Sequence, residues 1–172
     1  ANLKGVKMEL LQPFLKGIVS DIKGEASAEA TILGEGRLAS LNGYATVDSL
    51  DVNVDYLSTR FCAPSGRVDI VNNHFIVDKI AVYDSEGNRG SYSMDIGLDH
   101  LSNVTYNIDI TAKDMLVLDT EAKDNDLFYG HVYASGAASF RGDKRGIKMD
   151  IEGTSAENSK FFMPLLGKED VS

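Results

Sequence analysis

Apolar and polar residues alternate along most of this chain, which is the pattern of a β-strand with one dry and one wet face. The clearest alternation covers residues 50–56, 92–98 and 104–112. Weaker runs of the same kind cover residues 26–33, 68–71, 75–83, 115–118, 132–140 and 147–151. The pattern therefore predicts a mainly β fold from residue 24 onward.

Short loops separate these runs, which favours hairpins over the long crossovers that parallel strands need. Residues 84–88 and 141–146 are loops of hairpin length, rich in Gly and Asp. Between Val47 and Leu50 the apolar positions change from odd to even numbers, which predicts a bulge or bend near Asp48 and Ser49. We expect an antiparallel sheet.

The N-terminal region has a different period. Its apolar residues recur in adjacent pairs at four-residue steps, which predicts an amphipathic α-helix with the stripe Leu10, Leu11, Phe14, Leu15, Ile18, Val19 and Ile22. Pro13 suits the first turn, and Gly24 can end the helix. We predict one domain over residues 1–172, with the helix region at 1–23 and strands at 24–172. The helix residues expected to face the apolar side of the sheet are Leu11, Phe14, Leu15, Ile18 and Ile22.

The composition excludes several kinds of partner and site. Lys and Arg number 17 against 26 Asp and Glu, so the net charge is −9 and binding of nucleic acid through a basic face is not expected. The single cysteine, Cys62, cannot form a disulfide within the chain. No run approaches the roughly 20 apolar residues of a membrane-spanning helix, and the first residues lack the apolar core of a signal peptide. We interpret the chain as a piece of a larger protein.

One group of polar residues imitates a metal site. Asp51, Asn53 and Asp55 have the spacing of the start of a calcium loop, but Tyr56 takes the place of the glycine and Cys62 that of the final glutamate. Alternating acids are also typical of the wet face of a strand. We therefore predict a strand here and no metal.

The chain also lacks a recognisable catalytic motif. The three histidines, His74, His100 and His131, are too far apart in sequence for a zinc motif. No Gly-x-Ser-x-Gly elbow or phosphate-binding Gly loop is present. We interpret Cys62 as a buried, inert thiol. The prediction is a protein that is not an enzyme, with no catalytic residue and no cofactor.

The remaining candidate is the apolar face itself. The positions that we predict to line it are Leu50, Val52, Val54, Tyr56, Val68, Ile70, Tyr92, Met94, Ile96, Leu98, Val104, Tyr106, Ile108 and Ile110. A closed sandwich would bury this face as core. A curved sheet that stays open would leave it as a groove that shields acyl chains from water, at about 0.8 kcal/mol per buried methylene. The periodicity fits both arrangements.

Short segments follow one another along the chain in a particular order. They are Leu-Leu-Gln-Pro-Phe-Leu at residues 10–15, Gly66-Arg67-Val68 before His74-Phe75, Asp84-Ser85-Glu86-Gly87-Asn88 before Gly90, and Leu118-Asp119-Thr120 before Leu127-Phe128-Tyr129-Gly130 and Val132-Tyr133-Ala134-Ser135-Gly136. Together with strands that open on Gly, this order resembles the TamB family of the AsmA-like proteins, in the form found in Bacteroidetes. The resemblance covers most of the chain and contains no catalytic string.

The resemblance implies a fragment of a Gram-negative envelope protein that is anchored in the inner membrane and extends through the periplasm. Proteins of this family fold a sheet lengthwise into a trough with an apolar interior. The resemblance therefore implies a curved, open antiparallel sheet that shields phospholipid acyl chains during transport between the inner and outer membranes. It also implies an outer-membrane barrel partner of the Omp85 superfamily (TamA-like) and outer-membrane protein clients.

Two other functions fit the same alternation. One is a scaffold whose strand edges pair with strands of barrel or client proteins without carrying lipid. Such edges also favour edge-to-edge self-association of the fragment. The other is a closed β-sandwich of an adhesin or glycan binder, which predicts exposed aromatic platforms. Tyr44, Tyr129 and Tyr133 are the candidates for such platforms, and the chain has no Trp.

Overall fold

The computed structural model describes residues 2–14, 19–99, 103–124, 126–143 and 145–164. Most of these residues are in strands: β1 (Asn2–Lys7), β2 (Val19–Leu33), β3 (Ser40–Val54), β4 (Thr59–Val71), β5 (His74–Asp84), β6 (Arg89–Asp99), β7 (Asn103–Thr120), β8 (Tyr129–Asp143), β9 (Gly146–Ser155) and β10 (Lys160–Phe162). Three short 3-10 helices accompany them: η1 (Met8–Phe14), η2 (Gly36–Leu38) and η3 (Asp55–Leu57).

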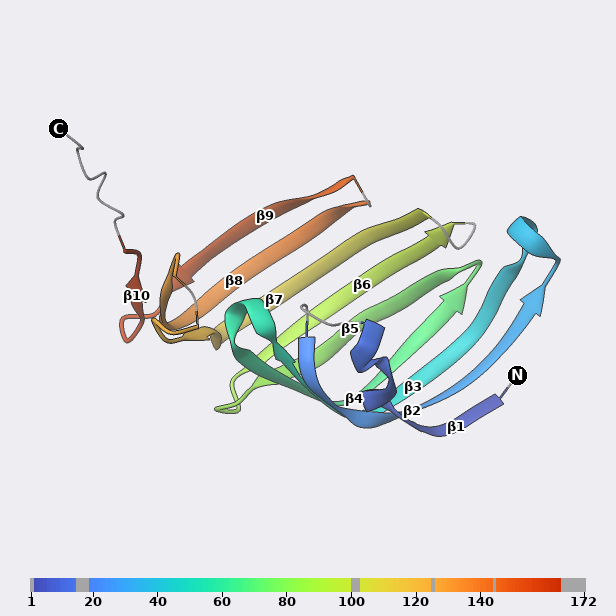
Figure 1. Cartoon of the computed structure of the whole chain (residues 1–172), viewed down its shortest axis with the longest axis horizontal. Helices are drawn as coiled ribbons and strands as arrows, with labels where there is room; N and C mark the ends of the chain where they lie inside the picture. Colours follow the sequence, from blue (N-terminus) through green and yellow to red (C-terminus); the bar gives the residue numbers. More distant parts are fainter. Residues whose placement is uncertain (1, 15–18, 100–102, 125, 144, 165–172) are drawn as a thin grey trace.

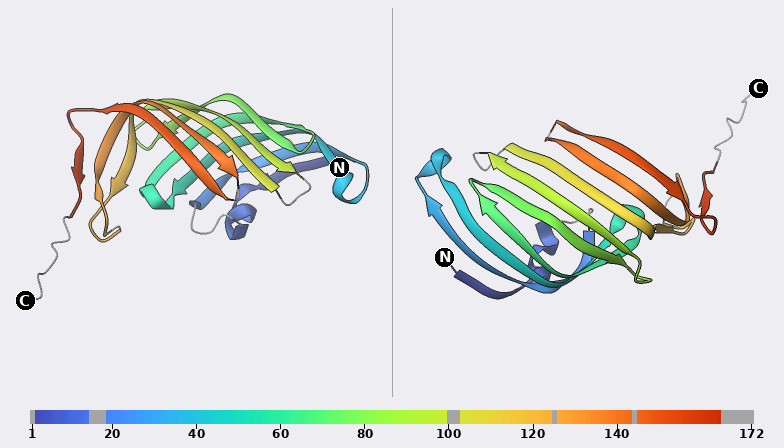
Figure 2. Two further views of the ribbon diagram at one scale, coloured as in Figure 1. Left: turned by 90° about the horizontal axis from the view of Figure 1, so that it is seen from above. Right: turned by 180° about the vertical axis from the view of Figure 1, so that it is seen from behind.

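The strands form one antiparallel sheet in which β1 to β8 follow their sequence order (Figure 1). Both β9 and β10 pair with the outer side of β8, at residues 134–143 and 129–131, so β10 continues the line of β9. Seen from above, the sheet is bent into an arch, with η1 and η3 on its inner side (Figure 2). The predicted mainly β, open and curved antiparallel sheet is confirmed.

Several β-bulges bend the strands. Four of them contain a non-glycine residue with positive φ, namely Asp21 (49°) in β2, Ser49 (54°) in β3, Lys79 (49°) in β5 and Asp114 (49°) in β7. At each of these positions the pairing with a neighbouring strand shifts by one residue, because two residues face one. The bulge predicted near Asp48 and Ser49 is therefore confirmed.

Each of these four bulges keeps apolar residues on the same side of the sheet although they are three positions apart. The pairs around the four bulges are Val19 and Ile22, Val47 and Leu50, Val77 and Ile80, and Ala112 and Met115. In β5, for example, Val77 pairs with Met94 and Ile80 pairs with Tyr92, which are two positions apart in β6. The bulges thus change the sequence period without changing which face is dry.

The predicted α-helix at the N-terminus is wrong in the described residues. Residues 8–14 form the 3-10 helix η1, and residues 19–23 belong to β2. Residues 2–7 are also a strand, so region 1–23 is not a helix region. The spacing of Val19 and Ile22 suggested a helix, but it comes from the bulge at Asp21. β-branched side chains such as these also favour strands.

The residues assigned to the helix face have different positions in the structure. Ile22 is 3% exposed and lies in β2. Leu15 and Ile18 are outside the described residues, and so are the side chains of Leu11 and Phe14. The side chain of Gln12 in η1 donates to the Val19 carbonyl at 2.9 Å and accepts the Ile22 N–H at 3.4 Å. Gln12 therefore covers backbone groups at the edge of β2 that β1 does not reach.

The turn between β4 and β5 is tied to strands on both sides of it. Asn72 and Asn73 both have positive φ, at 48° and 66°, as a two-residue hairpin turn of type I′ requires. Asn73 donates its N–H to the Leu41 carbonyl, and its Oδ1 accepts the Leu41 N–H at 2.7 Å. Its own carbonyl accepts the Leu98 N–H at 2.9 Å. Asn73 thus connects β3 with β6 beyond the end of the shorter β4–β5 hairpin.

The β4–β5 ladder is interrupted in its middle. Paired stretches end at Cys62 opposite Tyr83 and at Asp69 opposite Ile76, and residues between these points have no partner across the two strands in the described sheet. The Ile80 side chain occupies the gap. Its Cδ1 lies 2.6 Å from the position that a Cβ on Gly66 would take. The absence of a side chain at Gly66 makes room for Ile80.

Candidate functional site

The strand register places the predicted groove residues together. Residues opposite each other in an antiparallel pair point to the same side of the sheet. Between β6 and β7 the apolar partners are Leu98↔Val104, Ile96↔Tyr106, Met94↔Ile108 and Tyr92↔Ile110. The eight candidates on these two strands therefore share one face.

The same face continues through β3, β4 and β5. Its partners there are Val54↔Thr59, Val52↔Phe61, Leu50↔Ala63, Ala45↔Val68, Gly43↔Ile70 and Ile70↔Phe75. Tyr56 lies in η3, and its side chain is outside the described residues. All other members of the predicted set lie on this apolar face, which we call the concave face. That they bind a ligand stays a prediction.

Several members of the concave face are not among the residues predicted from the sequence. These are Phe61, Phe75, Val77, Ile80, Val82, Phe140 and the small residues Ala26, Ala28, Ala30, Ala45 and Ala138. Val77 and Ile80 are separated by a bulge, so strict alternation misses one of them. The alanines do alternate with polar residues from Glu25 onward, but their small side chains give a weak hydrophobic signal.

This face is the inner side of the arch. In the sheet, β5 and β6 lie between β7 and β4. The end of β7 nevertheless contacts β4 and η3, so these contacts are made across the inner side of the arch. They cover Thr59 and Asp84, which are 1% and 3% exposed and share the face of Val54 and Phe61 through the register. The apolar face is therefore concave, and the polar face is convex.

The concave face is not covered by a second layer in the described part of the chain. All described strands belong to one sheet, and most concave residues are only half-buried. At the margins, Ile32 is 69% exposed and Ile151 is 67% exposed. Of the two arrangements that the periodicity allowed, the structure has the open one.

Enclosed space on this face is small. A cavity of about 30 Å³ lies at the interrupted ladder, lined by Val47, Leu50, Ala63, Gly66, Val68, Ile80 and Tyr92. It has room for about one water molecule. Burial raises the pKa of the Tyr92 phenol, which therefore stays neutral at physiological pH. A wider depression of about 410 Å³ lies beside η1, but its lining is mostly polar. The candidate site is thus the open face and not an enclosed pocket.

The convex face carries ion pairs between neighbouring strands. Arg141 contacts both carboxylate oxygens of Asp109 at 2.7 and 2.8 Å. The Arg67 guanidinium lies 4.4 Å from the centre of the Tyr44 ring, beside Asp69. These groups are about half-exposed, so each pair contributes less than about 1 kcal/mol. They keep charge on the outer surface and away from the concave face.

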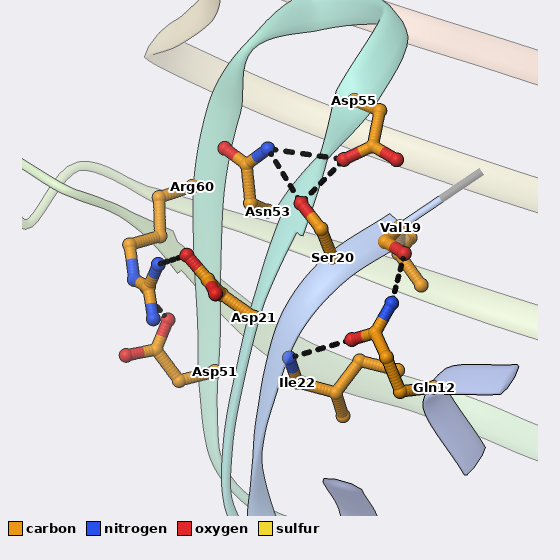
Figure 3. A network of polar contacts seen from close by, with 9 residues as sticks. All are labelled: Gln12, Val19, Ser20, Asp21, Ile22, Asp51, Asn53, Asp55 and Arg60. Atoms are coloured by element: carbon orange, nitrogen blue, oxygen red, sulfur yellow. Dashed lines mark hydrogen bonds and ion pairs between the residues drawn. The ribbon is translucent and has the colours of Figure 1, made fainter. Parts of the chain in front are cut away.

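A larger polar network joins β2, β3 and β4 near the first two bulges (Figure 3). Arg60 Nε lies 2.7 Å from Asp51, and Arg60 Nη1 lies 3.8 Å from Asp21. The Ser20 hydroxyl contacts Asp55 at 2.5 Å, and the Asn53 amide donates to both. Asp51 and Asn53 are thus on the wet face of β3, as predicted.

Among the described residues, no group of three or more His, Cys, Asp or Glu is placed to hold a metal ion. His74 and His131 each contact one carboxylate on the neighbouring strand, Asp95 at 2.7 Å and Asp119 at 2.5 Å. His100 lies outside the described residues.

Cys62 is half-buried on the convex face, opposite Asp51 and Tyr83 in the ladders of β4. The predicted buried thiol is therefore only partly covered. Arg60, two positions away on the same face, is held by Asp51.

Comparisons with known proteins leave the chain unassigned. None of the described helices has the length and the apolar run of a membrane-spanning segment. No protein-family model, curated protein or solved structure matches the chain.

Proposed function

We propose that this sheet is a non-enzymatic module that shields the acyl chains of phospholipids on its concave face. The observation that carries the proposal is an apolar surface running across β2 to β9 that no second layer of the described chain covers. Soluble domains rarely leave so broad an apolar surface without a ligand or a partner.

The energetics favour a hydrocarbon ligand. Each methylene moved from water onto an apolar surface contributes about 0.8 kcal/mol, so ten methylenes give a gross gain of about 8 kcal/mol. Part of this gain is lost to the entropy cost of association. Because apolar burial is non-directional, selectivity among amphiphiles should be weak.

The cellular setting of the proposal rests on the resemblance to TamB-like proteins. We propose that the chain is a periplasmic portion of an envelope protein anchored in the inner membrane of a Gram-negative bacterium. In this setting it would pass phospholipid toward the outer membrane, and its partners would be an Omp85-family barrel and outer-membrane protein clients. The net charge of −9 is compatible with a ligand held by its tails and not by anionic headgroups.

A second candidate function is strand pairing at an edge of the sheet. β9 pairs only with β8 in the described sheet, and Met149 and Ile151 on it are 58% and 67% exposed. An edge of ten residues with exposed apolar side chains is a template for another strand. A client strand, a barrel strand or a second copy of this chain could extend the sheet there.

A charge placed on the concave face distinguishes the two candidate functions, because it should affect lipid binding and not strand pairing at the edge. Ile108→Asp puts a carboxylate in the middle of β7, and Asn107→Asp puts the same group on the convex side of the same strand. Binding of a fluorescent anthroyloxy stearate is measured for both variants, with folding checked by circular dichroism. We expect Ile108→Asp to lose binding at least about tenfold, because a buried charge is strongly disfavoured next to hydrocarbon.

Asn107→Asp should bind like the unmodified protein. Equal binding by the two variants contradicts the proposal that the concave face is the lipid site. Mass spectrometry of the natively purified protein adds an independent readout, because a lipid carrier should retain phospholipid and an edge scaffold should not.

A further inference from the structure

The concave face is packed at one end of the strands and open at the other. Six of its most buried residues gather where β4 begins and where β5 and β7 end. They are Thr59, Ala63, Asp84, Met115, Leu118 and Thr120, each no more than 6% exposed, and we call this group the packed end. At the opposite end of the strands, Ile96, Leu98, Val104 and Tyr106 are only half-buried, and Ile70 in the same row is the one buried apolar side chain among the described residues there.

At the packed end, the β3–β4 and β7–β8 hairpins extend further than the β5–β6 hairpin that lies between them. The β5–β6 hairpin turns at Asp84–Asn88, whereas β7 continues to Thr120 and the β3–β4 connection extends to η3. The end of β7 therefore reaches across the β5–β6 turn and contacts η3 and β4 (Figure 1). These contacts form a wall across one end of the concave face.

The Asp84 carboxylate holds this wall in place. Its Oδ2 accepts the Leu116 N–H of β7 at 2.7 Å, and its oxygens also accept the N–H groups of Glu86 and Asn88 and the Asn88 side-chain amide, each at 2.9 Å. The ladder between β6 and β7 ends at Gly90 opposite Ala112, so the Leu116 N–H has no partner on β6 and donates to the Asp84 carboxylate instead. Hydrogen bonds to a carboxylate are stronger than those between neutral groups.

The chemistry of the concave face fits a hydrocarbon tail better than a peptide. Among the described concave positions, Asp84 is the only charged residue. Its carboxylate oxygens already accept the four hydrogen bonds given above. Most backbone N–H and C=O groups of the sheet are paired between strands, so a peptide backbone would find few partners. A hydrocarbon chain has no polar or charged groups, so no desolvation cost opposes its binding to this face.

We propose that the packed end stops the methyl end of a bound acyl tail. This inference rests on the proposed lipid-binding function. The tail lies along the strands with its methyl end against Met115 and Leu118, and the polar headgroup remains in water at the open end. Asp84 is a positioning residue that holds the stop. The distance from the open end to Met115 then sets the preferred tail length.

The experiment maps the two ends of the tail separately. Palmitate with a diazirine at its methyl end and palmitate with a diazirine near its carboxyl group are photolysed with the full chain, and adducts are located by peptide mass spectrometry. We expect the methyl-end probe to label residues 59–63 and 115–120, and the carboxyl-end probe to label residues 96–98 and 103–106.

Each other outcome has a definite meaning. Equal labelling of both ends by both probes shows that the tail has no fixed orientation along the strands, and it overturns the stop while keeping lipid binding. Labelling no higher than that of a denatured control overturns the lipid-binding function itself.

Two variants test the residues that form the stop. Met115→Ala removes about three side-chain heavy atoms from the wall, so the preferred saturated fatty acid should become longer, whereas Met163→Ala, at an exposed position after β10, should leave it unchanged. Asp84→Asn should reduce labelling of residues 115–120 by the methyl-end probe several-fold relative to labelling of residues 96–98 and 103–106 by the carboxyl-end probe. An unchanged length preference in Met115→Ala contradicts the proposal even if Asp84→Asn fails to fold.

Discussion

The side chain of Ile80 lies over Gly66, with its Cδ1 only 2.6 Å from where a Cβ on residue 66 would be. Gly66→Ala should therefore destabilise the fold by about 1 kcal/mol, because the added methyl overpacks the gap between β4 and β5. Ile80→Val removes the clashing atom, so the double variant should be more stable than the sum of the two single effects predicts. Urea unfolding followed by circular dichroism measures all three.

Gly146→Ala is the matched control, since a Cβ there meets nothing within 4 Å. If the changes in the free energy of unfolding caused by Gly66→Ala and Ile80→Val simply add in the double variant, the proposed contact between the two residues is contradicted.

Asp84 should make stability depend on pH in the acid range. Burial tends to raise the pKa of this carboxyl, but hydrogen bonds from Leu116, Asn88 and Glu86 outweigh it and leave the pKa below its ordinary value. Folding then favours the ionised form, so its contribution is complete above the unfolded pKa of about 3.9 and is lost as the pH falls through the lower folded value. Asp84→Asn should cost about 1–3 kcal/mol at pH 7.

The difference between wild type and Asp84→Asn should narrow below about pH 4. Guanidinium unfolding between pH 3 and pH 7 gives this difference at each pH. Asp78→Asn, which changes an exposed acid on the same strand, is the matched control. A constant difference over the whole range would mean that the charge of Asp84 is unimportant.

Asn73 should be more important for stability than its neighbour Asn72. Asn73→Gly keeps the positive φ of the turn but removes the bonds of Oδ1 to the Leu41 N–H and of Nδ2 to the Ala39 carbonyl. The expected cost is about 1–3 kcal/mol, because backbone groups of Ala39 and Leu41 lose their partners. Asn72→Gly has the same backbone requirement and should be nearly neutral. Thermal unfolding compares the two variants, and equal effects would refute the role of the Asn73 amide.

The hydroxyl of Ser135 should stabilise the bulge in β7. It accepts the Asp114 N–H at 2.8 Å and contacts the Asp114 carboxylate at 2.9 Å. Ser93 makes a single corresponding bond, from the Lys79 N–H at 3.1 Å. Ser135→Ala should therefore cost about 1 kcal/mol and Ser93→Ala less. Urea midpoints that rank the two variants in the opposite order would contradict this account.

The strands could be predicted because their alternation is uninterrupted. Residues 92–98 and 104–112 have one apolar and one polar face throughout, and they pair with each other along their whole length. The same alternation located the bulge at Ser49, since a change of phase is the direct sequence signal of an extra residue.

The N-terminal helix could not be corrected from the sequence alone. Val19 and Ile22 are three residues apart, and a bulged strand and a helix both place such residues on one side. The packed end could not be predicted from the sequence either. Asp84 resembles an ordinary turn residue, and its contact with Leu116, 32 positions later, is seen only in the fold. Long-range contacts of this kind leave no local signal.

The bulges in β3, β5 and β7 recur once per hairpin, each with a positive φ near 50°. Curvature is therefore a property of the two-stranded unit and not of the whole sheet. A gene encoding such a protein could grow by duplicating a hairpin, and every added copy would lengthen the arch without altering its cross-section. Divergence after duplication would then leave the irregular spacing of bulges, 30 residues from Ser49 to Lys79 and 35 from Lys79 to Asp114, that this chain displays.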